Sequence, residues 1–192
     1  MAVIRAYQPR DREAVERICA ETATGIFAWR SMRTAVLEIY CRYYIGREPE
    51  NCFVACDEND RPVGYILCAD DFNRWSRCFR DETIRGMWNP LARAAATASL
   101  KAPRKYALEY PAHLHVDILP RYHRQGIGTA LFAALREKLT ADGVHGVMLS
   151  AGAENRGAIA FYRSLGFTVL EKTATDAVMG LRLNESEQSD NP

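Results

Sequence analysis

Residues 113–128 read HLHVDILPRYHRQGIG, and the rest of the chain is interpreted around this stretch. Apolar and polar residues alternate at its start, a period of two that predicts a strand over 113–119 with one apolar and one polar face. Pro120 ends the strand because it has no N–H to give to a ladder. Two glycines follow, and beyond them apolar residues recur about every four positions. This spacing predicts an amphipathic helix over 126–140.

The turn between this strand and this helix has the chemistry of an anion site. The first N–H groups of a helix have no partner within it, and they lie at the positive end of the helix dipole. Without a Cβ at Gly126 and Gly128, phosphates can come within hydrogen-bonding distance of those N–H groups. Arg121, His123 and Arg124 add positive charge. The turn therefore favours a diphosphate ligand, although glycines that only shape a tight turn are an equal alternative.

The overall composition limits the classes of function. A chain of 192 residues with 48% hydrophobic residues predicts one domain, with or without an insertion. A net charge of +1 argues against a general nucleic-acid binder. No long apolar run or signal peptide is evident, so we expect neither a membrane span nor secretion. The six cysteines form no CxxC pair, which favours reduced structural thiols over zinc or disulfides and a cytoplasmic location.

Periodicity and breaker residues predict the other elements. These are a strand over 2–7, a helix over 11–23 with Asp11 as its N-cap, a helix over about 30–45, a hairpin of strands over 52–56 and 62–68, helices within 70–102, a charged loop over 101–105, a strand over 146–150, a helix from Asn155 to Leu165, and strands over 167–171 and 176–183. The strand over 146–150 should run parallel to that over 113–119, because strand, helix and strand form a βαβ unit. We expect the acidic tail, 184–192, to be disordered.

Two motifs together resemble those of the GNAT family of acyl-CoA N-acyltransferases. HRQGIG at 123–128 is similar to the family's Gln/Arg-x-x-Gly-x-Gly/Ala turn. NRGAIAFY at 155–162, followed by Gly166 and Phe167, is similar to its second motif, Asn-x-x-Ala-x-x-Phe-Tyr and then Gly-Phe. The resemblance is strong over about 110–172 and rests on the order of elements over 2–68. His123 departs from the usual Gln or Arg, which implies weakened but not lost affinity for CoA.

The resemblance implies an α/β GNAT fold, with a mixed central sheet of about six to seven strands flanked by helices. Two parallel strands of that sheet would splay apart at the acyl-CoA site. A single acyltransferase domain would span 1–183 and carry a helical insertion at about 70–105. Acetyl-CoA would be the cosubstrate, and no metal is implied.

The resemblance also assigns roles to individual residues. Tyr162 matches the family's general acid, although an aromatic core residue is the alternative. The base would be Asp117, with His115 close behind, since both lie on the polar strand face; a structural role is an equal alternative for either. A histidine near its usual pKa of ~6.5 suits proton removal at neutral pH, whereas an aspartate near ~3.9 needs burial or a water relay. Asn155 either binds pantetheine or caps its helix. The residues implied in acyl-CoA binding are Ile118, Leu119, His123, Arg124, Gln125, Gly126, Ile127, Gly128, Thr129, Asn155 and Phe161.

The implied activity is transfer of an acetyl group from acetyl-CoA to a primary amine of a small molecule or protein. The amine would attack directly in a ternary complex, and the enzyme would be a cytoplasmic monomer or homodimer. The alternative is a module that binds acyl-CoA without turnover. His123 favours it, as does the likeness of YPAHLHVDILP at 110–120 to the acetyltransferase-like domain appended to O-GlcNAcase. A dehydrogenase is disfavoured, because Leu131 stands where a dinucleotide fingerprint has its third glycine.

Overall fold

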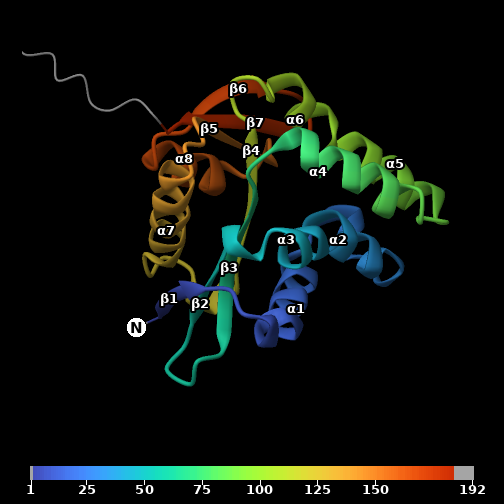
Figure 1. Ribbon diagram of the computed structural model, residues 1–192. Helices are drawn as coiled ribbons and strands as arrows, with labels where there is room; N and C mark the ends of the chain where they lie inside the picture. Colours follow the sequence, from blue (N-terminus) through green and yellow to red (C-terminus); the bar gives the residue numbers. More distant parts are fainter. Residues whose placement is uncertain (1, 184–192) are drawn as a thin grey trace, which may run out of the picture.

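A seven-stranded mixed sheet organises the computed structural model, which describes residues 2–183 (Figure 1). The strand order is β1-β2-β3-β4-β5-β7-β6. The strands are β1 (Val3–Ala6), β2 (Cys52–Cys56), β3 (Pro62–Ala69), β4 (Ala112–Ile118), β5 (Gly146–Gly152), β6 (Thr168–Lys172) and β7 (Asp176–Arg182). The α-helices are α1 (Arg12–Thr22), α2 (Arg33–Tyr40), α3 (Arg42–Arg47), α4 (Phe72–Cys78), α5 (Pro90–Ser99), α6 (Lys101–Tyr106), α7 (Ile127–Ala141) and α8 (Arg156–Ser164). The predicted mixed sheet flanked by helices is confirmed.

Helices cover both faces of the sheet. α1 packs on β3 and β4, α7 packs on β2 and β3, and the two helices lie on opposite sides of these strands in Figure 1. The stripe of Leu131, Leu135 and Leu139 is fully buried along α7, as its four-residue spacing predicts. Every residue of β3 is also buried. The core therefore surrounds the centre of the sheet, where β3 meets β4.

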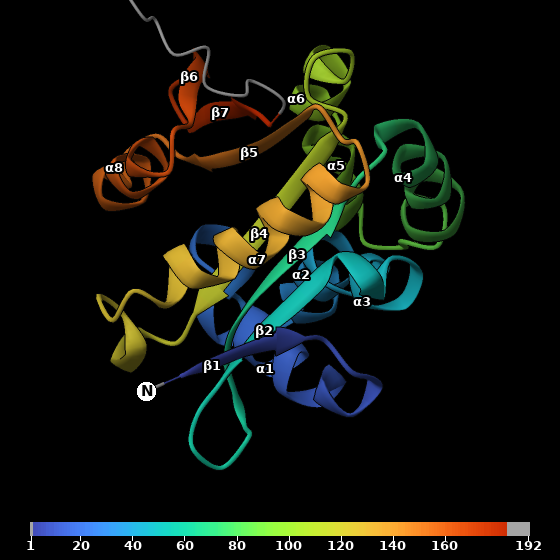
Figure 2. The same ribbon diagram turned by 60° about the vertical axis from the view of Figure 1, so that its left-hand side comes forward.

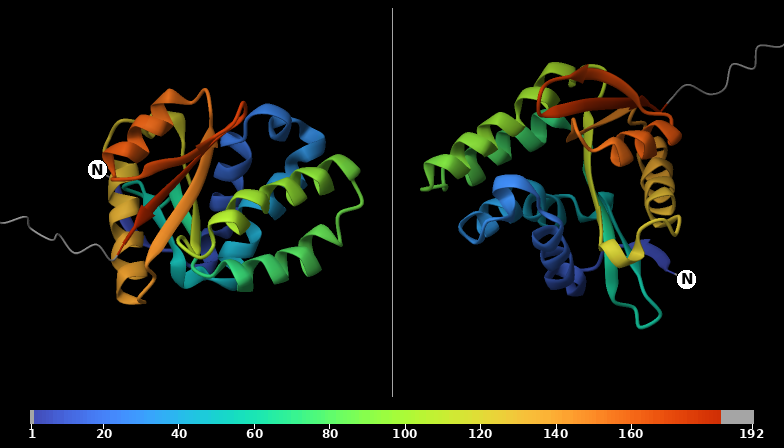
Figure 3. Two further views of the ribbon diagram at one scale, coloured as in Figure 1. Left: turned by 90° about the horizontal axis from the view of Figure 1, so that it is seen from above. Right: turned by 180° about the vertical axis from the view of Figure 1, so that it is seen from behind.

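A helical arm joins β3 to β4 and contains α4, a π-helical turn (Phe79–Ile84), α5 and α6. Figure 3 shows α4 and α5 side by side, projecting away from the sheet. Glu48, only 1% exposed, anchors the base of the arm. Its carboxylate accepts hydrogen bonds from Tyr43 Oη at 2.6 Å, Asp70 N at 3.0 Å and Arg74 Nη2 at 2.9 Å. A buried carboxylate needs such partners, so this cluster fixes where the arm leaves the core.

Two helix predictions differ from the structure. The helix predicted over about 30–45 is interrupted at Cys41, which has φ −134° and separates α2 from α3. The apolar spacing continues across the break, because both helices bury side chains in the same core, so periodicity alone cannot reveal it. The predicted loop over 101–105 is helix α6. Pro103 is compatible with that helix because it lies in the first turn, where an N–H has no acceptor.

Asp11 stands at the predicted N-cap of α1, but its carboxylate does not bond to that helix. It accepts instead from Arg5 Nη1 at 2.7 Å and from Gln8 N at 2.8 Å, so it joins β1 to the turn before α1. The structure holds the six cysteines as free thiols, five of them buried. None of the helices within residues 2–183 is long and apolar enough to span a bilayer. The predicted disordered tail, 184–192, lies outside the described residues.

Candidate active site

β4 and β5 diverge soon after they meet. They pair in parallel at Ala112–Val147 and His113–Met148, although β4 continues to Ile118. Figure 2 shows β5 turning away from β4 beyond this contact. The predicted splay between two parallel strands is confirmed.

Backbone hydrogen-bonding groups line this gap. Leu119 N donates to Val63 O at 2.9 Å, and the alternation of a ladder then directs the N–H and C=O of Val116 and Ile118 away from β3. On the other side, Ala153 N donates to Thr175 O at 2.9 Å, so the same alternation directs the groups of Ser150 toward the gap. An extended chain that carries amides could pair with these groups.

The start of α7 lies at the end of β4 and offers further donors. Gly126, its N-cap, has φ +75° and is exposed. The first bond within the helix runs from Ala130 N to Gly126 O at 3.0 Å, which leaves the N–H groups of Ile127, Gly128 and Thr129 without an intrahelical acceptor. Nothing in the described chain lies within 4 Å of a Cβ placed on Gly126. This turn therefore has both the donors and the room to hold an anion.

At Gly128, a glycine is required by close packing against a neighbouring side chain. A Cβ there would lie 2.8 Å from Phe161 Cζ and 3.5 Å from Ile118 Cδ1. The absence of a side chain lets the Phe161 ring of α8 pack against the first turn of α7. The expected role of this position in admitting phosphate is thus shared with a packing role, and Phe161 acts by positioning α8 against α7.

We expect Gly128→Ala to destabilise the protein by about 1–3 kcal/mol, because the new methyl group overpacks against Phe161. Shortening that ring in the double variant Gly128→Ala/Phe161→Leu should recover part of the loss. Urea denaturation of the wild type, the two single variants and the double variant measures the coupling. If the losses in free energy of unfolding are additive, the methyl group at position 128 does not clash with the Phe161 ring.

Other predicted binding residues make local bonds. The His123 ring is 2.8 Å, through Nε2, from Ile118 O, and so it turns back to the strand. Gln125 Nε2 donates to Arg121 O at 3.2 Å. Asn155 Oδ1 accepts from Ala158 N at 3.0 Å, which is the capping alternative. Arg124 is exposed and, with φ +59°, shapes the turn.

Asp117 lies on the polar face of β4. Its Oδ2 accepts a hydrogen bond from Tyr65 Oη at 2.5 Å. Burial raises the pKa of this carboxyl group to about 6, and the hydrogen bonds from Tyr65 and Thr22 oppose the rise. Asp117 is therefore a carboxylate at neutral pH, with far greater basicity than an exposed aspartate.

His115 is two residues away on the same face and has a different environment. Tyr44 Oη lies 2.9 Å from the Nε2 atoms of both His113 and His115. One hydroxyl proton can serve only one of these nitrogens, so at least one of the two rings must carry its proton on Nε2. Burial lowers the pKa of His115 to about 4, and burial also lowers that of His113 well below the usual value. Both rings are thus neutral and weakly basic.

Tyr162 lies on α8, and its hydroxyl is buried near Asp117. Burial raises the pKa of its hydroxyl above the usual value, and the charge of Asp117 adds to the rise. Its ring packs against those of Phe161 and Phe167, with centroids 5.2 and 5.7 Å away. The structure thus places a basic carboxylate and a protonated phenol close enough to interact electrostatically.

Comparison with known proteins shows the family of the chain. The model of the acetyltransferase (GNAT) family matches residues 13–167. The chain belongs to the acetyltransferase (GNAT) family. N-alpha-acetyltransferase 30 of Schizosaccharomyces pombe is 29% identical over 126 residues, which are 66% of this chain and 63% of that relative. The chain thus spans less than two thirds of the length of this GNAT relative.

Solved structures agree with the family. The crystal structure of SsHAT is 29% identical, with a TM-score of 0.82 over 96% of this chain and 99% of that chain. The PaiA N-acetyltransferase of Thermoplasma acidophilum, solved in complex with coenzyme A, is 17% identical, with a TM-score of 0.63 over 95% of this chain and 99% of that one. The predicted GNAT fold is confirmed, whereas the narrower likeness to the domain of O-GlcNAcase stays a prediction.

Sequence reasoning missed the residues that tune this GNAT site. Tyr65 of β3 and Tyr44 of α3 hold Asp117 and the two histidines, yet each appears in the sequence as one more aromatic core residue. The only available signal was that a buried tyrosine hydroxyl usually needs a partner. The alternation of β4 places polar groups on one face, but it does not say which aromatic residue meets them.

Proposed function

We propose that this GNAT protein transfers an acetyl group from acetyl-CoA to a primary amine, by direct attack in a ternary complex. One observation carries the proposal: the hydroxyl of Tyr162 is buried close enough to Asp117, on β4 beyond its pairing with β5, for the charge of Asp117 to raise the pKa of Tyr162. The acceptor is a small-molecule or protein amine. The coenzyme A in the solved PaiA structure supports the donor, since that protein shares the fold.

The residues at the gap suit such a donor. The N–H groups of Ile127, Gly128 and Thr129 would hold the diphosphate at the positive end of α7. The backbone groups of Val116 and the N–H of Ile118 would pair with the amides of the pantetheine arm, as an added strand does, because Ile118 O already bonds to His123 Nε2. Leu119 directly follows Ile118 and ends the extended segment that begins in β4. These contacts would aim the thioester at the space between Asp117 and Tyr162.

The side chains of Asp117 and Tyr162 would carry out the proton transfers of the reaction. An amine with a pKa near ~10 is protonated at neutral pH and is not a nucleophile in that form. Asp117 would accept one proton from the ammonium group, directly or through one water, and the freed amine would attack the thioester carbon to form the C–N bond. As the C–S bond breaks, Tyr162 would give its proton to the departing thiolate, and the second proton lost by the nitrogen would restore the Tyr162 hydroxyl. The two groups would thus act as base and acid.

The environments of the two candidate bases favour Asp117 over His115. Burial makes Asp117 more basic, whereas burial makes His115 less basic. His115 Nε2 is also within hydrogen-bonding distance of Tyr44 Oη. His115 therefore supports the site as a neutral group whose orientation is fixed by Tyr44.

We expect kcat at saturating substrates to fall about tenfold per pH unit below about pH 6. The sign follows from the carboxylate being the active form: protonation below its raised pKa removes the base. Asp117→Asn should lower kcat about a hundredfold or more. It should also abolish the fall of kcat below about pH 6, which is the acid limb of the pH profile. His115→Gln is the control and should keep the limb. An unchanged limb in Asp117→Asn would contradict the role of Asp117.

A module that binds acyl-CoA without turnover is the second candidate, favoured by the His123 ring turning to Ile118 O instead of adding charge to the turn. Calorimetry with acetyl-CoA and a thiol-release assay over a panel of amines separate the two candidates. Binding with CoA release by at least one amine supports the enzyme. Binding with no release by any amine supports the module.

A further inference from the structure

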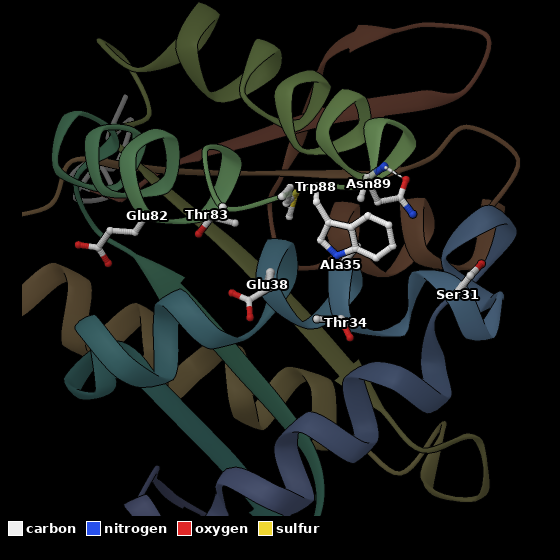
Figure 4. A pocket seen from close by; sticks show the side chains of 11 residues that line it. Ser31, Thr34, Ala35, Glu38, Glu82, Thr83, Trp88 and Asn89 are labelled. Carbon is white, nitrogen blue, oxygen red and sulfur yellow. Dashed lines mark hydrogen bonds between the residues drawn. The ribbon is translucent and has the colours of Figure 1, made fainter.

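A second cavity lies away from the β4–β5 gap, between α2 and the helical arm. Its volume is about 350 Å³, within the range of ligand pockets. Figure 4 shows its walls: Thr34 and Glu38 on α2, Glu82 and Thr83 on the π-helical turn, and Trp88 and Asn89 before α5. Glu82, Thr83, Trp88 and Asn89 all come from the arm, so the cavity depends on it.

The charged groups of the cavity are all acidic. Among the described residues that line it, Glu38 and Glu82 are charged and none is basic. Glu38 Oε1 accepts from Arg42 Nη1 at 2.6 Å, and both oxygens of Glu82 accept from Arg47 Nη2. A carboxylate has about four acceptor positions, so each can take a further donor from the cavity side.

Trp88 adds an aromatic surface that is 91% exposed. The segment that presents it is well held: Met87 O accepts from Arg93 Nη2 at 2.7 Å, and Asn89 Oδ1 accepts from Leu91 N at 3.0 Å. Trp88 lines this cavity with Glu38 and Glu82, and it lines the neighbouring surface with Arg93 and Lys101. On the cavity side, an indole near carboxylates can bind an organic cation through cation–π attraction.

The cavity is close to the candidate active site because both use α2. The Tyr40 ring, at the end of α2, packs edge-on against His115 with centroids 5.1 Å apart. Helical rise is about 1.5 Å per residue, so Thr34 and Glu38 lie roughly 3–9 Å along α2 from Tyr40. An extended peptide covers that span with about three residues, at roughly 3.3 Å each.

We propose that this cavity binds the guanidinium or ammonium group of a basic side chain about three residues from the acetylated amine of a peptide acceptor. Trp88 would stack on the cation, and Glu38 would accept a hydrogen bond from it. This inference rests on the proposed function and names its substrate class: a peptide with a basic residue near its reactive amine.

The test compares two glycine-rich hexapeptides with a free N-terminal amine, one with arginine and one with citrulline at the fourth position. Citrulline has nearly the same shape and no charge. Fluorescence anisotropy measures each labelled peptide against the protein saturated with CoA. We expect the arginine peptide to bind about tenfold more tightly to the wild type. Equal affinities would overturn the proposal.

Variants then locate the preference. Trp88→Ala and Glu38→Gln should reduce it to about twofold or less. Leu108→Ala, which removes an exposed apolar side chain elsewhere, and Glu58→Gln, which neutralises an exposed hairpin carboxylate, should keep it. Thermal melting checks that each variant is folded, and Trp88→Ala is safe in this respect because the ring is exposed. A preference that survives both cavity variants would overturn the proposal.

Thiol release with the same peptides separates this inference from the proposed function. Turnover of both peptides without any preference in binding would reject the cavity and leave the enzyme. Preferential binding of the arginine peptide without turnover of any amine would reject the enzyme and leave the cavity as a peptide site.

Discussion

Tyr162→Phe lowers kcat about a hundredfold or more and leaves the Kd of acetyl-CoA unchanged, if the hydroxyl acts as we propose. The variant removes one oxygen, and the ring contacts with Phe161 and Phe167 remain. A raised pKa keeps the hydroxyl protonated at neutral pH, which is the form that a general acid needs. The loss should therefore fall on the chemical step.

Stopped-flow or steady-state thiol release gives kcat, and calorimetry gives the Kd of acetyl-CoA. Tyr106→Phe is a matched control, because its hydroxyl bonds to Glu171 at 3.0 Å, away from the gap. We expect that control to keep wild-type kcat. If Tyr162→Phe also keeps it, the phenol is a core residue and another group protonates the thiolate.

Gly126→Val abolishes measurable binding of acetyl-CoA, the second large effect that we expect. Gly126 has φ +75°, a conformation that a β-branched residue adopts only with strain. The space around its Cβ position is open within the described chain, so no clash with the protein is expected. The side chain would instead stand where the diphosphate approaches the N–H groups of α7.

Gly143→Val is the control for backbone strain. Gly143 follows the other end of α7, also has φ +75°, and also has nothing within 4 Å of its Cβ position. Both variants should lose similar stability in thermal melting, and Gly143→Val should keep wild-type affinity in calorimetry. Unchanged affinity in a folded Gly126→Val variant would refute the assignment of the phosphate site.

The framework of the site was predictable because it depends on local patterns. Alternation over 113–119, the glycines and the leucine stripe predicted β4, the turn and α7 in their right order. The two motifs then implied the family and the splay of β4 from β5. What these features share is that a few neighbouring residues determine each of them.

Properties that depend on tertiary packing were not predictable. The sequence predicts Asp117 as the base with His115 close behind, but the difference in basicity between them comes from burial. Burial lowers the pKa of His115 and raises that of Asp117, and no local pattern reports burial at that depth. The packing of Phe161 against Gly128 joins residues of two helices. The break at Cys41 is hidden because the apolar spacing continues through it.

The raised pKa of Asp117 has a consequence for evolution under selection for robustness. A carboxyl group that binds its proton more tightly when folded destabilises the folded state once the pH exceeds its unfolded pKa, with the full effect above about pH 6. A rise of about two pKa units corresponds to about 3 kcal/mol at neutral pH. Selection for a high free energy of unfolding alone would therefore favour replacement of Asp117. If Asp117 is retained in related proteins, its retention indicates selection for catalysis.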